Sequence, residues 1–217
     1  MEIQRQAPVL RTHLLKMTML SQRAVDYSIK AYELGNEELY QLAHHSDHEW
    51  HEVQQSIGNR GRALVAAGTP IDADSLIACC MLRVYSGLRV TYTAAAEIAQ
   101  NAMMIVDRKR SAQYSNLLEM GRFANNLVRL CTVAIFKREI QHAKTIVQNR
   151  AGRQRFDLLM SNTVDFLKHR RCAHAGFELA IAKSLGQIAE QAYEIAEALA
   201  LCVDCESPIG VTLRRAA

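Results

Sequence analysis

Proline is scarce in this chain, with 3 residues among 217, and only Pro70 lies between Pro8 and Pro208. Aromatic residues make up 6% of the sequence. Together with the β-branched residues they nowhere alternate with polar residues over the length of a strand. Strands of a half-buried sheet need that alternation, whereas long helices need stretches without proline. The sequence therefore predicts an all-α fold.

Long apolar runs are also missing. Charged residues interrupt every apolar stretch before it reaches the roughly 18 residues that a membrane-spanning helix requires. The first residues lack the basic start and the apolar run of a secretory signal. We therefore expect a cytoplasmic protein that is not integral to a membrane.

The chain has no strong excess of one charge. Its 26 Lys and Arg residues stand against 22 Asp and Glu residues, which gives a net charge of +4. The basic residues form short separate runs, such as 108–110 and 150–155, which would have to align in space to bind the phosphates of a nucleic acid. No nucleic acid is expected as a partner, and salt-dependent binding to duplex DNA would test this expectation.

Motifs of enzymes are likewise missing. Gly58 and Gly61 form only a fragment of a glycine-rich phosphate loop. Cys172 and His174 lack the strand, turn and orienting carboxylate of a nucleophile site. We expect no catalysis, and the only cofactors that stay open are a divalent metal ion or iron.

The chain is rich in helical periodicity. Apolar side chains recur every three or four residues from Arg11 to Leu34, after which Gly35 and Asn36 supply a helix end and a new N-cap. A second, continuous helix is predicted over 36–67, and further helices near 72–106, 112–137, 139–168 and 173–203. Apolar residues of the third helix recur at steps of four and three, which predicts a packing seam of Met81, Tyr85, Leu88, Tyr92, Ala95, Ala99, Ala102 and Val106.

An internal repeat divides these helices into two sets of three. Shifting the chain by 97 positions superimposes residues 78–107 on 175–204, and nine of these thirty positions are identical. Residues 14–17 and 117–120 correspond in the same way at a shift of 103. We predict two tandem three-helix bundles, over 8–107 and 111–205, and a flexible tail over 206–217.

Two kinds of sequence motif resemble those of a known family. Residues 64–74 read Leu-Val-Ala-Ala-Gly-Thr-Pro-Ile-Asp-Ala-Asp, and the third helix of each half ends in Ala-x-Glu-Ile-Ala, at 95–99 and at 192–196 within the phrase 185–197. This order of landmarks resembles the PhoU family of phosphate-uptake regulators, over about residues 10–204. The resemblance implies two PhoU-like bundles, which are similar to spectrin repeats.

The resemblance also implies a function. Members of the family are cytosolic, usually dimeric adaptors without enzymatic activity. They restrain a phosphate-responsive sensor histidine kinase and contact the ATPase subunit of the phosphate transporter. We therefore expect a regulator of phosphate transport and phosphate homeostasis that acts through protein contacts.

A metal motif of the family is mostly lost here. Its members carry an acid-x-x-x-Asp motif on the third helix of each half, where carboxylates one turn apart gather iron or other metal ions. The matching residues are Arg89 and Thr93 in the first half, and Gly186 and Glu190 in the second. Only Glu190 keeps an acid, so the resemblance implies a weakened metal site.

A histidine cluster in the second helix supports an alternative function. His44, His48 and His51 are spaced to share one helix face with Asp47 beside them, and imidazole and carboxylate are usual zinc ligands. The spacing does not match the zinc-protease motif. The alternatives are therefore a metal-storage or metal-sensing bundle and an ordinary solvated helix face.

Three acids are candidate partner contacts. Glu97 and Glu194 occupy equivalent positions in the repeat, and Asp74 closes the phrase that leads into the third helix. We expect Glu97 and Glu194 to lie on the surface. The lone tryptophan, Trp50, is expected in the core opposite the histidine cluster.

Overall fold

The computed structural model describes residues 2–44, 47–66, 73–106, 115–137, 139–169 and 174–204. This part of the chain forms helices without a strand: α1 (Glu2–Leu34), α2 (Glu37–His44), α3 (Asp47–Ala66), α4 (Ala73–Val106), α5 (Ser115–Lys137), α6 (Ile140–Gln148), α7 (Arg150–His169) and α8 (Ala175–Asp204). The prediction of an all-α fold is confirmed. The predicted tail 206–217 lies outside the described residues.

The end of α1 follows the local sequence signals. Gly35 adopts a φ of 60°, and its N–H donates to the carbonyl of Ala31 at 2.9 Å. A positive φ is the conformation that glycine tolerates best at a helix end. Asn36 then accepts hydrogen bonds on Oδ1 from the backbone N–H groups of Glu38 and Leu39, at 2.8 and 3.3 Å. The predicted helix end and N-cap are confirmed.

Of the continuous helix predicted over 36–67, the structure describes 37–44 as α2 and 47–66 as α3, while residues 45, 46 and 67 lie outside the described part. The single helix predicted over 139–168 is wrong, because it is divided at Asn149, whose Oδ1 accepts a hydrogen bond from the N–H of Gly152 at 2.9 Å. An asparagine that caps the following helix replaces the hydrogen bonds that would continue the preceding one. Gly58 does not interrupt α3.

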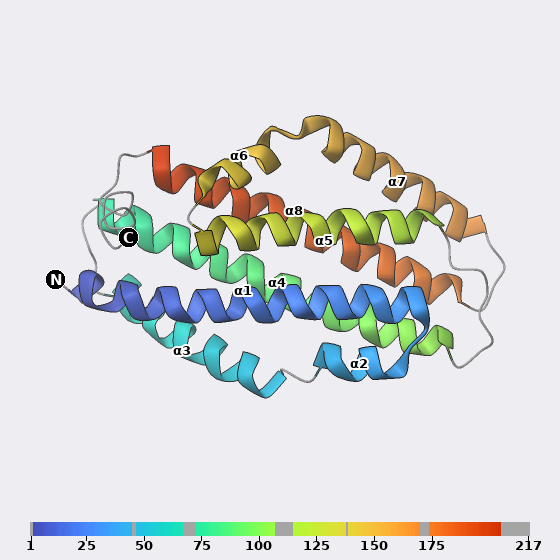
Figure 1. Cartoon of the computed structure of the whole chain (residues 1–217), viewed down its shortest axis with the longest axis horizontal. Coiled ribbons are helices and arrows are strands. Elements are labelled where there is room, and N and C mark those ends of the chain that lie inside the picture. Colours follow the sequence, from blue (N-terminus) through green and yellow to red (C-terminus); the bar gives the residue numbers. More distant parts are fainter. Residues whose placement is uncertain are drawn as a thin grey trace.

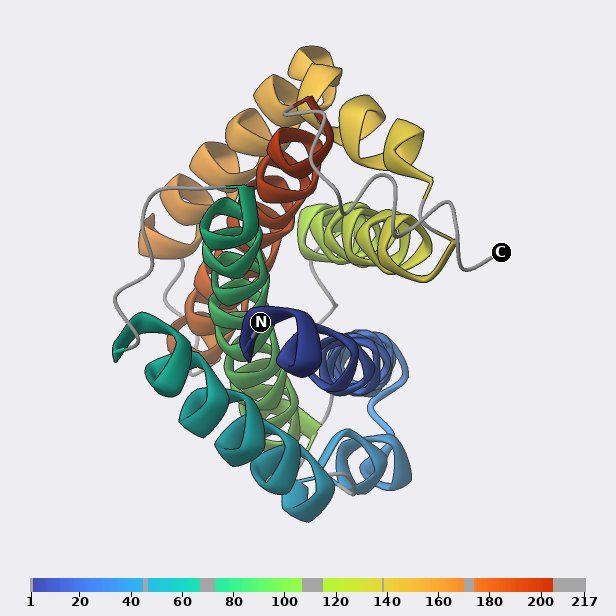
Figure 2. The ribbon, with the colours of Figure 1, turned by 90° about the vertical axis from the view of Figure 1, so that its left-hand side faces the viewer.

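Four long helices form the centre of the molecule. α1, α4, α5 and α8 pack together, while α2 and α3 flank α1 and α4, and α6 and α7 flank α5 and α8 (Figures 1 and 2). The most extensive pairing joins α4 and α8. These two helices are antiparallel, because Arg83 pairs with Glu197 at 3.7 Å while Ser184 donates to Glu97 at 2.9 Å.

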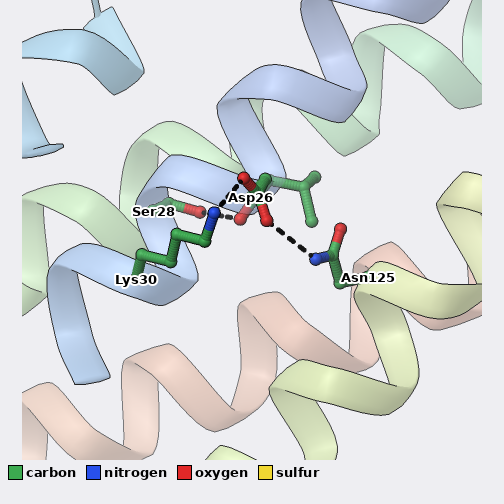
Figure 3. A network of polar contacts seen from close by, with 5 residues as sticks. Asp26, Ser28, Lys30 and Asn125 are labelled. Atoms are coloured by element: carbon green, nitrogen blue, oxygen red, sulfur yellow. Dashed lines mark hydrogen bonds and ion pairs between the residues drawn. The ribbon is translucent and has the colours of Figure 1, made fainter. Parts of the chain in front are cut away.

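Polar contacts join α1 to α5 in the same antiparallel sense. Asn125 donates to Asp26 at 3.1 Å, and Arg122 pairs with Glu33 at 2.7 Å. Figure 3 shows Asp26 between Asn125 of α5 and Lys30 of its own helix, whose ammonium donates to it at 2.8 Å. The first helices of the two halves, α1 and α5, therefore lie side by side.

The predicted seam lies in the core. Of its described side chains Leu88, Tyr92, Ala95, Ala99 and Ala102 are buried, and residues from both halves form one continuous apolar cluster. In each half a long helix comes first (α1, α5) and another comes last (α4, α8), with the flanking helices between them in the sequence. This order supports the repeats 8–107 and 111–205, which stay a prediction.

Across the described ranges, no helix combines the length and the apolar character that crossing a bilayer would demand.

Candidate functional site

A cleft of about 630 Å³ opens between α3, α4 and α8. Its polar lining comes from α3 (Asp47, His51, Gln54), α4 (Arg89, Thr93, Glu97) and α8 (Gln187). The remaining lining is Trp50, Val90, Tyr92, Ala94 and Ala96. Charged and amide groups thus gather around a partly apolar floor, which is the usual composition of a binding site.

Two stacked aromatic rings form the inner wall of the cleft. Trp50 and Tyr92 have ring centroids 4.0 Å apart and planes within 5° of parallel. They are only 2% and 6% exposed, so the prediction that Trp50 belongs to the core is confirmed. Because both rings bury a large apolar surface, the stack holds α3 firmly against α4 at this point.

A hydrogen bond fixes the start of α3 next to this stack. The hydroxyl of Tyr92 donates to Asp47 Oδ1 at 2.6 Å. Burial, followed by the hydrogen bond to Asp47 and its charge, raises the pKa of Tyr92 far above its ordinary value. Tyr92 therefore stays a neutral donor, and Asp47 is held at the cleft wall.

The register between α3 and α4 follows from two contacts. Asp47 accepts from Tyr92, and the Gln54 carbonyl accepts from the Tyr85 hydroxyl at 3.4 Å. The chain advances seven residues along α3 between these contacts and goes back seven along α4, so the helices are antiparallel. This register places His51 opposite residue 88, which is next to Arg89.

The α4 wall carries opposite charges at its two ends. Arg89, Thr93 and Glu97 follow one another at four-residue steps, so they share one stripe of the helix. All three are exposed. Glu97 Oε2 accepts a hydrogen bond from the buried hydroxyl of Ser184 on α8. The guanidinium of Arg89 and the carboxylate of Glu97 therefore lie at the two ends of the α4 wall, and the carboxylate of Asp47 lies on the α3 wall.

The predicted metal ligands are distributed over several places. His44 is the last described residue of α2, and its side chain lies outside the described part. His48 is exposed and lies 3.7 Å from Glu52, whereas His51 and Asp47 line the cleft. Within the described residues, no group of three or more His, Cys, Asp or Glu side chains is placed to hold a metal ion. The metal site at this cluster stays a prediction.

The positions that match the family's metal motif also lie on different helices. Arg89 and Thr93 line the cleft from α4, while Gly186 and the exposed Glu190 lie on α8. A cation at Arg89 would be repelled by the guanidinium. A metal site at Glu190 stays a prediction.

The three predicted partner contacts have different surroundings. Glu97 is exposed at the cleft, and Glu194 is half-buried on α8. Asp74 lies in the first turn of α4, and its side chain is outside the described part. The sequence does not indicate Gln54, Gln187 or Ser184 as site residues, because their roles depend on the packing of α3 and α8 against α4.

The fold of this chain matches two solved structures over most of their length. A crystal structure of PhoU from Pseudomonas aeruginosa is similar at 18% sequence identity and a TM-score of 0.81, over 93% of this chain and 98% of that one. A crystal structure of the phosphate transport system regulatory protein PhoU from Streptococcus pneumoniae is similar at 18% identity and a TM-score of 0.71, over 92% and 96%. No protein-family model and no curated protein matches the sequence. The chain has a PhoU-like fold, as predicted.

Proposed function

We propose that this protein regulates phosphate transport and phosphate-responsive signalling through contacts with other proteins. The observation that carries this proposal is the likeness to PhoU structures, which extends over 93% of the chain rather than over one bundle. One of these structures is named as a phosphate transport system regulatory protein. A fold preserved over both halves supports a shared mode of action, although fold alone does not determine function.

The cleft supports a binding role rather than catalysis. Both of its carboxylates already accept hydrogen bonds from hydroxyl groups, Asp47 from Tyr92 and Glu97 from Ser184. A carboxylate held in this way is a fixed acceptor, which suits recognition of a partner. We propose that the protein acts through such contacts rather than through catalysis.

The proposed partners are the ATPase subunit of the phosphate transporter and a phosphate-sensing histidine kinase. We also propose that the protein is a cytoplasmic homodimer. Glu97, Glu194 and Asp74 would contribute to partner binding, since acids at an interface rim attract basic patches and raise the rate of association. Glu97 suits this role best, because Ser184 fixes its carboxylate at the surface.

Affinity capture from cells grown with ample phosphate tests the proposal. The full chain should retain the ATPase subunit or the kinase at a defined stoichiometry, and purified partner should rebind. Glu97→Arg should weaken that binding several-fold, because a rim charge is reversed. Glu52→Arg, which reverses an exposed charge on α3 outside the cleft, is the matched control and should bind as the wild type does. Recovery of neither partner would contradict the proposal.

A further inference from the structure

The part of the cleft around Arg89 and His51 offers hydrogen-bond donors for an anion. Arg89 of α4 lies there with His51 of α3 almost opposite, and the amide of Gln54 is close by on the same wall as His51. A guanidinium offers a planar fork of N–H donors, and imidazole and amide groups add further donors. Donors from two helices therefore surround one end of the cleft.

The acids of the cleft do not neutralise Arg89. Its side chain forms no ion pair with any described residue at the distances where Lys16 and Glu49, or Arg122 and Glu33, do. Glu97 is two turns further along α4, about 12 Å away at the rise of an α-helix, and is bound by Ser184. Asp47 accepts from the neutral hydroxyl of Tyr92 and keeps its negative charge, but it forms no ion pair with Arg89. The guanidinium can therefore still donate to a ligand.

We propose that this cleft binds a small phosphate-bearing ligand, with the oxyanion held between Arg89 of α4 and His51 of α3. A phosphate group presents several oxygens at once, so it can accept from the guanidinium fork and from the opposite helix together. A site that faces solvent can release such an anion again, which suits a reversible ligand. This site shares Glu97 with the partner contacts proposed above, whereas Arg89 and His51 belong to the ligand site alone.

The rest of the cleft fits the organic part of such a ligand. Its volume of about 630 Å³ exceeds the space of one phosphate group. Glu97 and Gln187 at the far end accept hydrogen bonds from hydroxyl groups, and Val90, Ala94 and Ala96 supply apolar contact. A sugar phosphate would place its phosphate group at Arg89 and its hydroxyl groups at Glu97 and Gln187. Free phosphate would contact only the part of the cleft around Arg89.

Titration of the purified full chain tests the site. Inorganic phosphate and glucose 6-phosphate are added separately to about 10 mM at constant ionic strength, a range that covers millimolar affinity. Trp50, the only tryptophan, lines the cleft and reports binding by its fluorescence, and calorimetry gives the stoichiometry. The proposal predicts saturable binding of at least one ligand at one site per chain.

Two variants locate the anion. Arg89→Gln should weaken binding about tenfold or more, as the loss of a charge-assisted hydrogen bond does. Arg129→Gln removes the same charge from an exposed place on α5, outside the cleft, and should leave binding unchanged. Circular dichroism of both variants confirms that they are folded. Equal losses in the two variants, or no saturable binding of either ligand, would overturn the proposal.

A third variant distinguishes the source of the phosphate. If the ligand is a sugar phosphate, glucose 6-phosphate should bind more tightly than inorganic phosphate. Glu97→Gln should then reduce the ratio of the two affinities several-fold. Equal affinities that both depend on Arg89 would assign the site to free phosphate. Because no partner protein is present, a negative titration leaves the regulatory proposal to be judged by the capture experiment.

Discussion

The contact of α3 with α4 and the contact of α7 with α8 use corresponding positions in different ways. Trp50 and Arg153 are each the fourth residue of their helix. Trp50 stacks on Tyr92 in a buried pair, whereas the exposed Arg153 places its guanidinium carbon 4.9 Å from the ring centroid of Tyr193. Tyr92 donates to Asp47, but the buried Tyr193 hydroxyl has no hydrogen-bond partner within the described residues.

This difference shows how two similar helix arrangements acquire different roles. In the first half, aromatic stacking and a charge-assisted hydrogen bond fix α3, and the same residues build one wall of the cleft. In the second half, α7 contacts Tyr193 of α8 through a cation–π pair with an exposed arginine, whereas the buried Phe156 of α7 stacks on Phe123 of α5. The aromatic stack therefore joins α3 to the last helix of the first half, but joins α7 to the first helix of the second half.

The largest effect should come from Trp50→Ala. Loss of a fully buried tryptophan should lower the free energy of unfolding by about 3–5 kcal/mol, because it removes apolar burial and leaves a cavity. Arg153→Ala, the matched change in the second half, should cost only about 0.5–1 kcal/mol. Urea unfolding followed by far-UV circular dichroism measures both. Similar losses in the two variants would contradict the contrast between the halves.

Adding a methyl group at two helical glycines should give opposite results. A Cβ on Gly87 of α4 would lie 2.7 Å from Cγ1 of the buried Ile195, so Gly87→Ala should destabilise by about 1–2 kcal/mol in spite of its better helix propensity. A Cβ on Gly186 would meet only the flexible end of the half-buried Met160. Gly186→Ala should therefore be neutral or stabilise by up to about 1 kcal/mol.

Thermal and urea unfolding of these two alanine variants give the comparison directly. A loss at Gly186 as large as at Gly87 would mean that α7 is packed against α8 as rigidly as α4 is.

Removing a single hydroxyl separates the two tyrosines. Tyr92→Phe breaks the hydrogen bond to Asp47 and should lower the free energy of unfolding by about 1–2 kcal/mol. Tyr193→Phe removes a buried hydroxyl without a partner among the described residues, so it should be neutral or slightly stabilising. Equilibrium unfolding in urea measures whether each variant has a lower or a higher free energy of unfolding than the wild type. A destabilised Tyr193→Phe variant would reveal an acceptor for that hydroxyl.

The smallest effect concerns alkaline pH. Tyr92 has a pKa raised above the ordinary 10.0 by burial and by Asp47, so above about pH 10 the unfolded chain gives up a proton that the native chain keeps. The free energy of unfolding should therefore fall as the pH rises from that point. Burial raises the pKa of Cys131 from 9.0 to about 12, which adds a fall of the same sign that begins near pH 9.

Unfolding curves of the wild type and of Tyr92→Phe between about pH 8 and pH 11 test this dependence. The variant should lose less stability per pH unit above pH 10. Parallel pH profiles would show that Tyr92 ionises equally in the native and unfolded states.

Local signals in the sequence predicted much of the fold. Gly35 and Asn36 act within one helix turn, so their cap geometry could be inferred from residue type. The seam of α4 was also predictable, since its spacing directs Leu88, Tyr92 and Ala95 to one face. The division at Asn149 was missed because the bond from the backbone N–H of Gly152 to its side chain can form wherever a helix restarts after an asparagine, so the residue type alone did not mark the break.

The cleft required information that periodicity does not contain. Arg89, His51 and Glu97 each attracted attention in the sequence for a different reason, yet nothing along the chain places them around one space. Their proximity follows from the antiparallel register of α3 on α4 and from the packing of α8 against both ends of α4. Tertiary packing decides such contacts, while local propensity decides only the helices that make them.

We propose that this chain regulates the response to phosphate, and gene expression tests this proposal most directly. Phosphate-starvation transcripts are measured in phosphate-rich medium after deletion of the gene in its source organism and after its restoration. These transcripts should rise in the deletion strain and return to the original level when the gene is restored. Transcript levels that do not change on deletion would contradict it.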